Sequence, residues 1–340
     1  MSNPFRIVHI EPLPDWIRGI YDSVREDPDY DLVWAADLAD GAVDPVLKGT
    51  KAIVTGKRRV NEQLIRAAGP TLRLIQVVGR APWAVDTDYA REVGVPVSFL
   101  PHRGAIAVAE HTFALLIGLM RKLVPGHLGT VGAEYQRLEI EPIRTNERVI
   151  AFNWLGFPDV QQLFGKTIGL VGLGDIGLEV ARRARAFDME VLYTKREALP
   201  REYDEMLGVR YASLHELLDS SDVVSLHAPQ TAETEGLIGG EALSRMKEAA
   251  VLVNTARGGL VDEGALVEAL RSGSIAGAGL DVFVAEPLPV KHGLLDLDNV
   301  LLSPHVGGGT GGGQKGVVAD VIANLERVSR GRLPLHLELP

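Results

Sequence analysis

The feature that most constrains this chain is a glycine pattern set between an apolar run and an amphipathic segment. Residues 167–171 (TIGLV) have the apolar character of a buried parallel strand, and GLGDIG follows directly at 172–177. Apolar residues then recur at helical spacing as far as Phe187, and 190–194 reads as a second strand. A strand, a G-x-G-x-x-G turn, a helix and a strand in this order predict a dinucleotide-binding unit.

Each residue of the pattern has an expected role. Gly172 allows the tight turn, Gly174 lets the backbone approach a pyrophosphate at the helix N-terminus, and Gly177 lets the helix sit close to the strand. Asp175 and Ile176 complete the predicted contacts of the glycine turn with the cofactor, although the favoured interpretation of Asp175 is a solvent-facing loop residue.

Composition narrows the class of protein. A chain of 340 residues is longer than one core usually serves, so two domains are expected. The net charge of -10 argues against a nucleic-acid partner, and the absence of cysteine excludes thiolate chemistry and cysteine-held metals, so no metal is predicted. The N-terminus lacks a signal-peptide pattern, and Glu110 and His111 interrupt the apolar segment 105–120, so we expect a buried helix, no membrane partner and a cytoplasmic protein.

Two α/β units are expected. In the first, strands are predicted at 5–10, 32–35, 51–55, 72–78 and 95–100, with helices at 15–25, 61–68 and 86–92. A helix at 105–123 and a connection at 125–162 with one or two short helices lead to the second unit. Its later strands are predicted at 209–211, 223–226, 251–254, 276–280 and 300–302, and its helices at 214–218, 240–246, 262–270 and 314–329.

The predicted fold class is therefore α/β, with two doubly wound parallel-sheet domains and a cleft between them. Residues 109–304 are assigned to a Rossmann nucleotide domain. Residues 1–108 and 305–340 are assigned to a flavodoxin-like substrate domain.

Polar residues follow the late strands of the second unit. Arg257 comes soon after 251–254, Asp281 and Glu286 follow 276–280, and His305 follows 300–302. Because ligands bind at the carboxyl ends of parallel strands, these side chains are expected along the rim that holds the nucleotide. An arginine can polarise a carbonyl and bind a carboxylate. A histidine can supply a proton, and a nearby carboxylate favours the protonated form of that histidine. This set suits hydride transfer to a carbonyl.

With these motifs the chain resembles the D-isomer-specific 2-hydroxyacid dehydrogenases. The resemblance is carried by the glycine turn and by LHAP (226–229), NTARGGLVDEGAL (254–266), GAGLDVFVAEPLP (277–289), LLSPHVGGGT (301–310) and AVAEHTFALLIGLMR (107–121). It implies that Arg257 orients the substrate carboxylate and polarises the 2-oxo group. It further implies that Glu286 hydrogen-bonds the general acid/base His305, and that Asp281 holds the nicotinamide carboxamide. The remaining implied cofactor contacts are His227, Pro229, Thr255 and Ala256.

The resemblance also places a carboxylate-binding loop after the strand at 72–78. It includes Gly79, Arg80, Trp83 and Ala84, with backbone N–H groups near the last two as donors. Four features depart from the family pattern: Ala84 stands where glycine is usual, Gly104 stands where asparagine is usual, Trp83 is bulky, and the glycine run 307–313 is unusual for a helix start.

Each site residue also has a structural alternative. Arg257 could form a surface ion pair, Glu286 could only shape the turn before Pro287, and His305 could be a satisfied buried histidine. For His227 a structural hydrogen bond is the favoured interpretation. Three residues near the predicted domain junction stay undecided: His102, Arg103 and His111.

The residues at the end of the predicted strand 190–194 indicate whether the cofactor is NAD or NADP. An acidic residue there binds the ribose 2′-OH in NAD enzymes. The family position, 18 residues after Gly177, is occupied by Lys195, flanked by Thr194 and Arg196. These residues suit a 2′-phosphate, so NADPH is favoured over NADH, with a solvated basic turn that tolerates NAD as the alternative.

The function predicted is hydride transfer between a nicotinamide and a small 2-oxoacid or D-2-hydroxyacid. The resemblance implies a homodimer. The alternative is an NAD(H)-sensing corepressor or scaffold, which is disfavoured by the lack of a tail or disordered segment for partners. Glyoxylate, hydroxypyruvate, pyruvate and larger branched acids all remain open as substrates.

Overall fold

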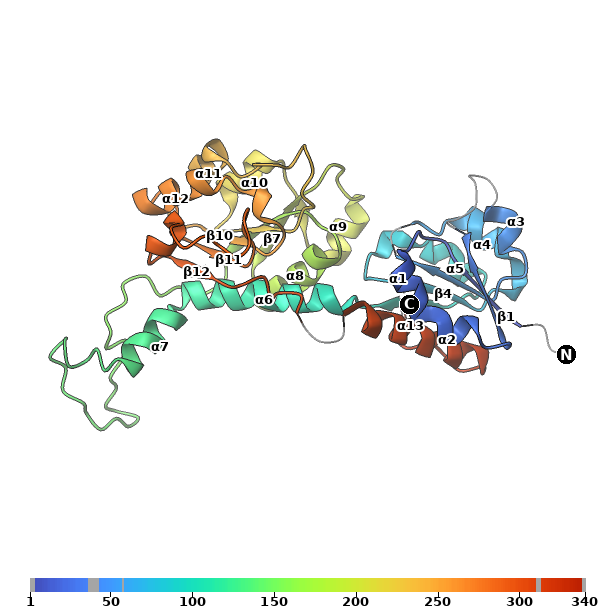
Figure 1. Ribbon diagram of the computed structural model, residues 1–340, viewed down its shortest axis with the longest axis horizontal. Coiled ribbons are helices and arrows are strands. Elements are labelled where there is room, and N and C mark those ends of the chain that lie inside the picture. Colours follow the sequence, from blue (N-terminus) through green and yellow to red (C-terminus); the bar gives the residue numbers. More distant parts are fainter. Residues whose placement is uncertain (1–3, 36–42, 57, 310–312, 338–340) are drawn as a thin grey trace. The chain divides into compact units, whose positions relative to one another are not determined.

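The computed structural model describes residues 4–35, 43–56, 58–309 and 313–337. The chain forms two compact units (Figure 1). The first combines Met1–Ala107 with Gly308–Pro340, and the second is Val108–Gly307.

The first unit is built on a five-stranded parallel sheet in the order β2-β1-β3-β4-β5, which is the flavodoxin-like order. Its strands are β1 (Phe5–His9), β2 (Tyr30–Trp34), β3 (Ala52–Thr55), β4 (Leu74–Val78) and β5 (Val97–Leu100). In the register, Ile7 lies between Leu32 and Ala52.

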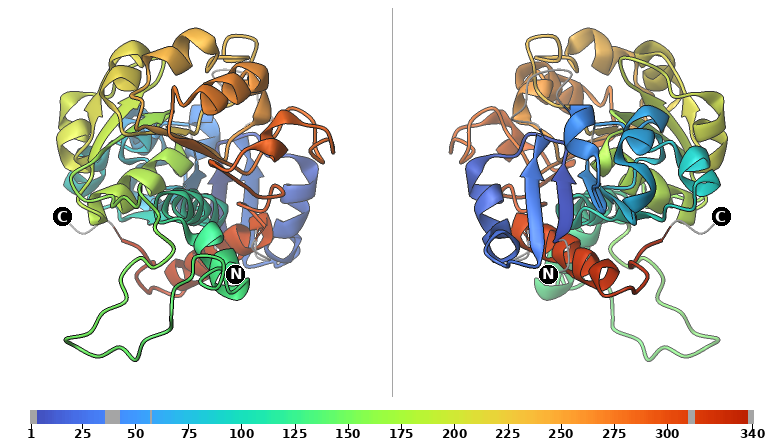
Figure 2. Two further views of the ribbon diagram at one scale, coloured as in Figure 1. Left: turned by 90° about the vertical axis from the view of Figure 1, so that its left-hand side faces the viewer. Right: turned by 90° about the vertical axis from the view of Figure 1, so that its right-hand side faces the viewer.

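Helices cover both faces of this sheet. On one face α3 (Val43–Leu47), α4 (Glu62–Ala68) and α5 (Thr87–Glu92) bury apolar residues against strand residues such as Val8 and Ile53. On the other, α1 (Asp15–Arg18), α2 (Asp22–Arg25) and α13 (Gly313–Ser329) do so against residues such as Ile7 and Val54 (Figure 2). Asn61 and Asp86 cap the N-termini of α4 and α5, since each side chain accepts the backbone N–H group three residues further on.

The second unit has a seven-stranded parallel sheet in the order β12-β11-β10-β9-β6-β7-β8. Its strands are β6 (Thr167–Val171), β7 (Glu190–Thr194), β8 (Arg210–Tyr211), β9 (Val223–Leu226), β10 (Val251–Asn254), β11 (Gly277–Leu280) and β12 (Val300–Leu302). The strand order reverses between β6 and β9, and in doubly wound sheets a ligand binds at this switch point.

Helices also cover both faces of the second sheet (Figure 1). On one side lie α6 (Arg103–Met120) and α8 (Asp175–Ala186), and on the other lie α10 (Leu214–Ser220), α11 (Gly240–Arg245) and α12 (Glu263–Ser272). Two further helices are α7 (Leu123–Val131) and α9 (Arg201–Leu207). The short 3₁₀ turns are η1 (Gly19–Tyr21), η3 (Gly69–Thr71), η4 (Pro82–Ala84), η5 (Gly258–Leu260) and η6 (Gly293–Asp296).

Helix α6 is the one helix among the described residues with the length and apolar character to cross a membrane. More than half of this helix is buried in the structure. The core helix of a folded domain can have the same length and apolar character, so these features argue only weakly for a membrane span.

The predicted fold class, two parallel-sheet α/β domains, is confirmed, and several local predictions need correction. Helices α3 and α9 were not predicted, and the helix expected at 15–25 is interrupted by the 3₁₀ turn η1. The helix expected to reach 123 ends at Met120, because Lys122 adopts a left-handed conformation (φ 53°) and α7 begins at Leu123. In the glycine run, residues 310–312 lie outside the described part of the chain.

Candidate active site

The glycine turn after β6 forms an open cradle at the N-terminus of α8. Gly172 has φ +105°, and a Cβ on it would lie 2.7 Å from the carbonyl carbon of His227, so only glycine fits there. Gly174 is exposed, and a Cβ on it would meet no atom within 4 Å. The protein's own packing therefore does not demand Gly174, and the open space before Asp175 suits a pyrophosphate approaching the helix. The cradle fits a dinucleotide.

The basic stretch predicted from the sequence lies beside this cradle. Thr194 pairs with Val171 in the sheet, and its carbonyl oxygen accepts the Gly172 N–H at 2.9 Å. Arg196 forms an ion pair with Glu233 at 3.2 Å, and both side chains are over three-quarters exposed. Sequence reasoning missed Glu233, whose exposed pairing is weak and can yield to a ligand phosphate.

The turn that follows β10 and carries Arg257, called the arginine turn below, is held by one buried side chain. Asn254 accepts the Ala256 N–H at 3.0 Å through Oδ1 and donates to the Arg257 carbonyl oxygen at 2.9 Å through Nδ2. Arg257 itself is exposed. A Cβ on Gly258 would lie 1.9 Å from the backbone of Phe283, so glycine lets the arginine turn lie directly on the loop that leads to Glu286.

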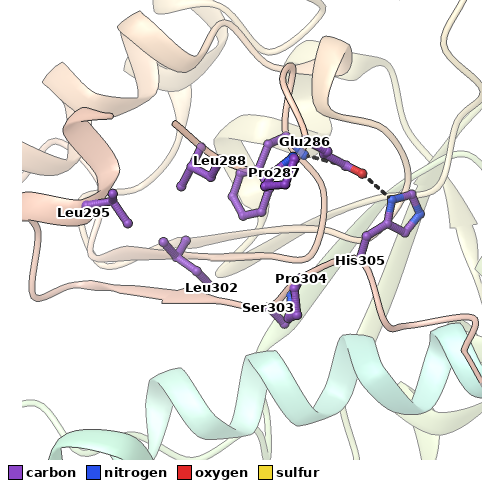
Figure 3. Close-up of a pocket in the computed structure, with 9 residues that line it drawn as sticks. Glu286, Pro287, Leu288, Leu295, Leu302, Ser303, Pro304 and His305 are labelled. Carbon is purple, nitrogen blue, oxygen red and sulfur yellow. Dashed lines mark hydrogen bonds and ion pairs between the residues drawn. The ribbon is translucent and has the colours of Figure 1, made fainter. Parts of the chain in front are cut away.

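Two predicted residues from different strand ends meet in a direct contact. His305 Nδ1 lies 2.7 Å from Glu286 Oε2 (Figure 3). The other carboxylate oxygen accepts the Phe283 N–H at 3.0 Å. The hydrogen bond from His305, with the one from Phe283, holds the pKa of the Glu286 carboxyl below its ordinary value of 4.5. Glu286 is therefore ionised at neutral pH and able to stabilise a positively charged imidazole.

The pair borders a pocket of ≈ 530 Å³ with a largely apolar wall. Its lining includes Phe283, Leu288, Leu295 and Leu302 (Figure 3). His305 has φ +54°, an uncommon conformation for a residue with a side chain, and such conformations concentrate at functional sites.

Comparison with known proteins shows the family to which this chain belongs. The model of the D-isomer specific 2-hydroxyacid dehydrogenase NAD binding domain matches residues 141–307. Glyoxylate reductase from Korarchaeum cryptofilum is 39% identical over 274 residues, which are 79% of this chain and 77% of that protein. The chain belongs to the D-isomer-specific 2-hydroxyacid dehydrogenase family. The family model is that of an NAD-binding domain, so a nicotinamide dinucleotide is the cofactor class.

Two further comparisons agree. D-3-phosphoglycerate dehydrogenase from Bacillus subtilis is 36% identical over 282 residues, and the aligned part spans about half (49%) of that longer protein. The crystal structure of a glyoxylate reductase from Paecilomyes thermophila is similar with a TM-score of 0.55 and 31% identity, over 99% of each chain.

In this family member, the carboxylate oxygens of Asp281 accept hydrogen bonds from other groups of the protein. Its buried carboxylate accepts the N–H groups of Val306 (2.9 Å) and Gly307 (2.8 Å) and the Ser303 hydroxyl (2.6 Å). His111 Nε2 lies 2.8 Å from the Ser303 hydroxyl and 3.2 Å from Asp281. Because the Ser303 hydroxyl donates its hydrogen bond to Asp281, it can only accept one from His111, so His111 Nε2 must carry a hydrogen. The structure thus shows Asp281 anchoring the turn that presents His305, while its contact with a carboxamide stays a prediction.

The side chains of three other predicted cofactor residues are engaged or buried within the protein. The His227 imidazole contacts the Ser225 hydroxyl at 2.9 Å, the structural hydrogen bond favoured from the sequence, and burial lowers its pKa to about 3. Thr255 is buried, and its hydroxyl forms a hydrogen bond of 2.9 Å with the Thr112 hydroxyl. Ala256 is also buried. These side chains do not line the open cradle.

The predicted substrate loop lies in the first unit. Gly79 has φ +122°, and Pro82–Ala84 form the 3₁₀ turn η4. The N–H of Ala84, one of the expected carboxylate donors, donates to the Ala81 carbonyl oxygen at 3.0 Å, and Ala84 is buried. As the loop stands, that donor is used within the turn.

The undecided residues near the junction now have partners. His102 accepts the Ala105 N–H at 3.2 Å, and Arg103 forms a two-point ion pair with Asp320, both at 2.7 Å. Both contacts are structural, whereas His111 belongs to the network around Asp281.

Proposed function

We propose that the protein transfers a hydride between a nicotinamide cofactor and a small 2-oxoacid, with the D-2-hydroxyacid as the reduced form. The observation that carries the proposal is the 2.7 Å contact between His305 and an ionised Glu286 at the carboxyl edge of a sheet with a dinucleotide cradle. Family membership supports the reaction class.

The chain's own residues supply binding and a proton. Reduced nicotinamide supplies the hydride when bound. Arg257 binds the substrate carboxylate and polarises the 2-oxo group. His305 uses Nδ1 to contact Glu286, so Nε2 is the nitrogen that gives its proton to the carbonyl oxygen as the alcohol forms. In the reverse direction, neutral Nε2 accepts that proton. Glu286 stabilises the charged imidazole in both directions.

A panel of 2-oxoacids tests the reaction. Oxidation of NADPH or NADH is followed at 340 nm with glyoxylate, hydroxypyruvate, pyruvate and branched acids. Glyoxylate comes first because curated relatives are named glyoxylate reductases. Turnover with one of these acids supports the proposal. Cofactor binding without turnover of any of them would instead favour a nicotinamide-sensing corepressor or scaffold.

Glu286→Gln is expected to move the alkaline limb of the kcat/KM profile for reduction to lower pH. Because the pKa of Glu286 is depressed, its carboxylate persists until the pH falls below 4.5, so the negative charge faces His305 across the neutral range. Without that charge the protonated imidazole is disfavoured, and the proton donor is lost at a lower pH. Profiles from pH 5 to 10 for wild type and variant measure the shift, and superimposable limbs would disprove the pairing.

We propose NADPH as the preferred cofactor. Lys195 and Arg196 follow β7 beside the cradle, and no acidic residue stands at 194–196. We expect kcat/KM with NADPH to exceed that with NADH by about tenfold, which is roughly 1.4 kcal/mol. Lys195→Asp combined with Arg196→Pro should reverse the preference by removing phosphate contacts and adding a repelling charge. Glu233→Gln is the matched control, since it frees Arg196 and should favour NADPH further. A wild-type preference for NADH would refute the assignment.

We also propose a homodimer, joined through the segment 121–162. Helix α7 and the chain after it extend away from the sheet of the second unit (Figures 1 and 2). This segment exposes large apolar side chains that include Leu128, Val131, Ile150 and Phe152. It contains five Lys or Arg and five Asp or Glu, so two copies meet without the repulsion that a net charge of -10 gives the whole chain. Light scattering should report a mass twice that of the 36.7 kDa chain. The Phe152→Glu variant should have the mass of a single chain. A monomeric wild type would contradict this.

A further inference from the structure

The loop that carries Glu286 is tied to helix α12 by a carboxylate to which the reaction gives no role. Glu263, the first residue of α12, accepts the Val284 N–H at 2.8 Å through Oε1. Its Oε2 lies 3.2 Å from His292 Nε2. One side chain thus holds both ends of the segment 284–292.

The hydrogen on His292 is assigned by its neighbours. His292 Nδ1 accepts the Leu294 N–H at 3.3 Å and so caps the turn η6. Because Nδ1 accepts, the imidazole hydrogen sits on Nε2 and is donated to Glu263. The side chains of Glu263 and His292 are largely buried, at 16% and 20% exposure, so this contact is shielded better than the exposed pair of Glu268 and Arg271 on the same helix.

The tie reaches Glu286 through one short path. Val284 directly follows Phe283, whose N–H binds the Glu286 carboxylate at 3.0 Å, and Glu286 Oε2 meets His305 at 2.7 Å. On the other side, the backbone of Phe283 and Val284 packs on Gly258, next to Arg257. A shift of the loop away from α12 would therefore move Glu286 relative to His305.

We propose that Glu263 is a positioning residue, which sets the geometry of the Glu286–His305 pair by holding the 284–292 loop on α12. The inference rests on the proposed function, since it gives Glu263 an effect on proton transfer. It assigns no contact between Glu263 and the substrate or cofactor.

A double-mutant cycle distinguishes this role from general stabilisation. Glu263→Ala should lower kcat/KM for 2-oxoacid reduction by about tenfold, because small misplacements of acid/base groups are costly. In a Glu286→Gln background the same change should cost less than about threefold, since the residue through which Glu263 acts is already altered. Glu263→Gln keeps an acceptor for the Val284 N–H and should recover part of the activity. If the alanine variant folds poorly, the glutamine variant serves for the same comparison.

Glu268→Ala is the matched control. Glu268 lies on the same helix, is 74% exposed and pairs only with Arg271 in the described structure, so its loss should leave kinetics unchanged. An equal loss from Glu263→Ala in both backgrounds, or a loss no larger than that of the control, overturns the inference. A wild-type protein that reduces no 2-oxoacid would instead overturn the proposed function.

Discussion

Replacing His305 with glutamine is expected to lower kcat for 2-oxoacid reduction by about 10²–10⁴-fold, the usual contribution of a positioned proton donor. Glutamine has a similar reach and can still donate a hydrogen bond to Glu286, but it has no proton to transfer. Steady-state kinetics with the best 2-oxoacid measure the loss. Cofactor dissociation constants from fluorescence titration should stay within about twofold, because His305 lies outside the glycine cradle. A variant that keeps more than half of the wild-type kcat would rule out the assigned role.

The second large effect is expected from Arg257→Gln. Hydrogen bonds to charged groups contribute about 1.5–3 kcal/mol each, so losing a two-point contact to the substrate carboxylate should lower kcat/KM by about 10²-fold or more. Arg257→Lys should recover only part of this, since an ammonium group cannot reproduce the planar fork. Arg271→Gln is the control, because Arg271 pairs with Glu268 on the exposed face of α12. A loss of less than about fivefold in both Arg257 variants would show that the substrate is bound elsewhere.

Elements with strong periodicity or distinctive glycines could be predicted from the sequence. The β6–turn–α8 unit was predicted because its apolar run, its glycines and its amphipathic helix each indicate the same structure. The missed helices lack such signals. Helix α9 (REYDEML) buries no residue and leaves Met206 60% exposed, so it shows no apolar face. Helix α3 has only five residues, too few to show a helical period.

The candidate site was predictable where side chains follow strand ends and not where backbone atoms complete it. Arg257, Glu286 and His305 could be placed from strand positions and family motifs. The donors to Asp281 include the N–H groups of residues 306 and 307, and the donor to Glu263 is the Val284 N–H. A sequence carries no signal for such contacts, because every residue except proline has this donor.

Isotope transfer tests the central claim most directly. The wild-type protein is incubated with the best 2-oxoacid whose product is chiral, such as hydroxypyruvate or pyruvate, and with NADPH that carries deuterium at the transferable position of its nicotinamide ring. The hydroxyacid is analysed by mass spectrometry and chiral chromatography. Direct hydride transfer at this site predicts one deuterium on C2 of the D-enantiomer, with the yield in a fixed time falling about 10²-fold or more in His305→Gln. An unlabelled product, the L-enantiomer, or an equal yield from both proteins would contradict it.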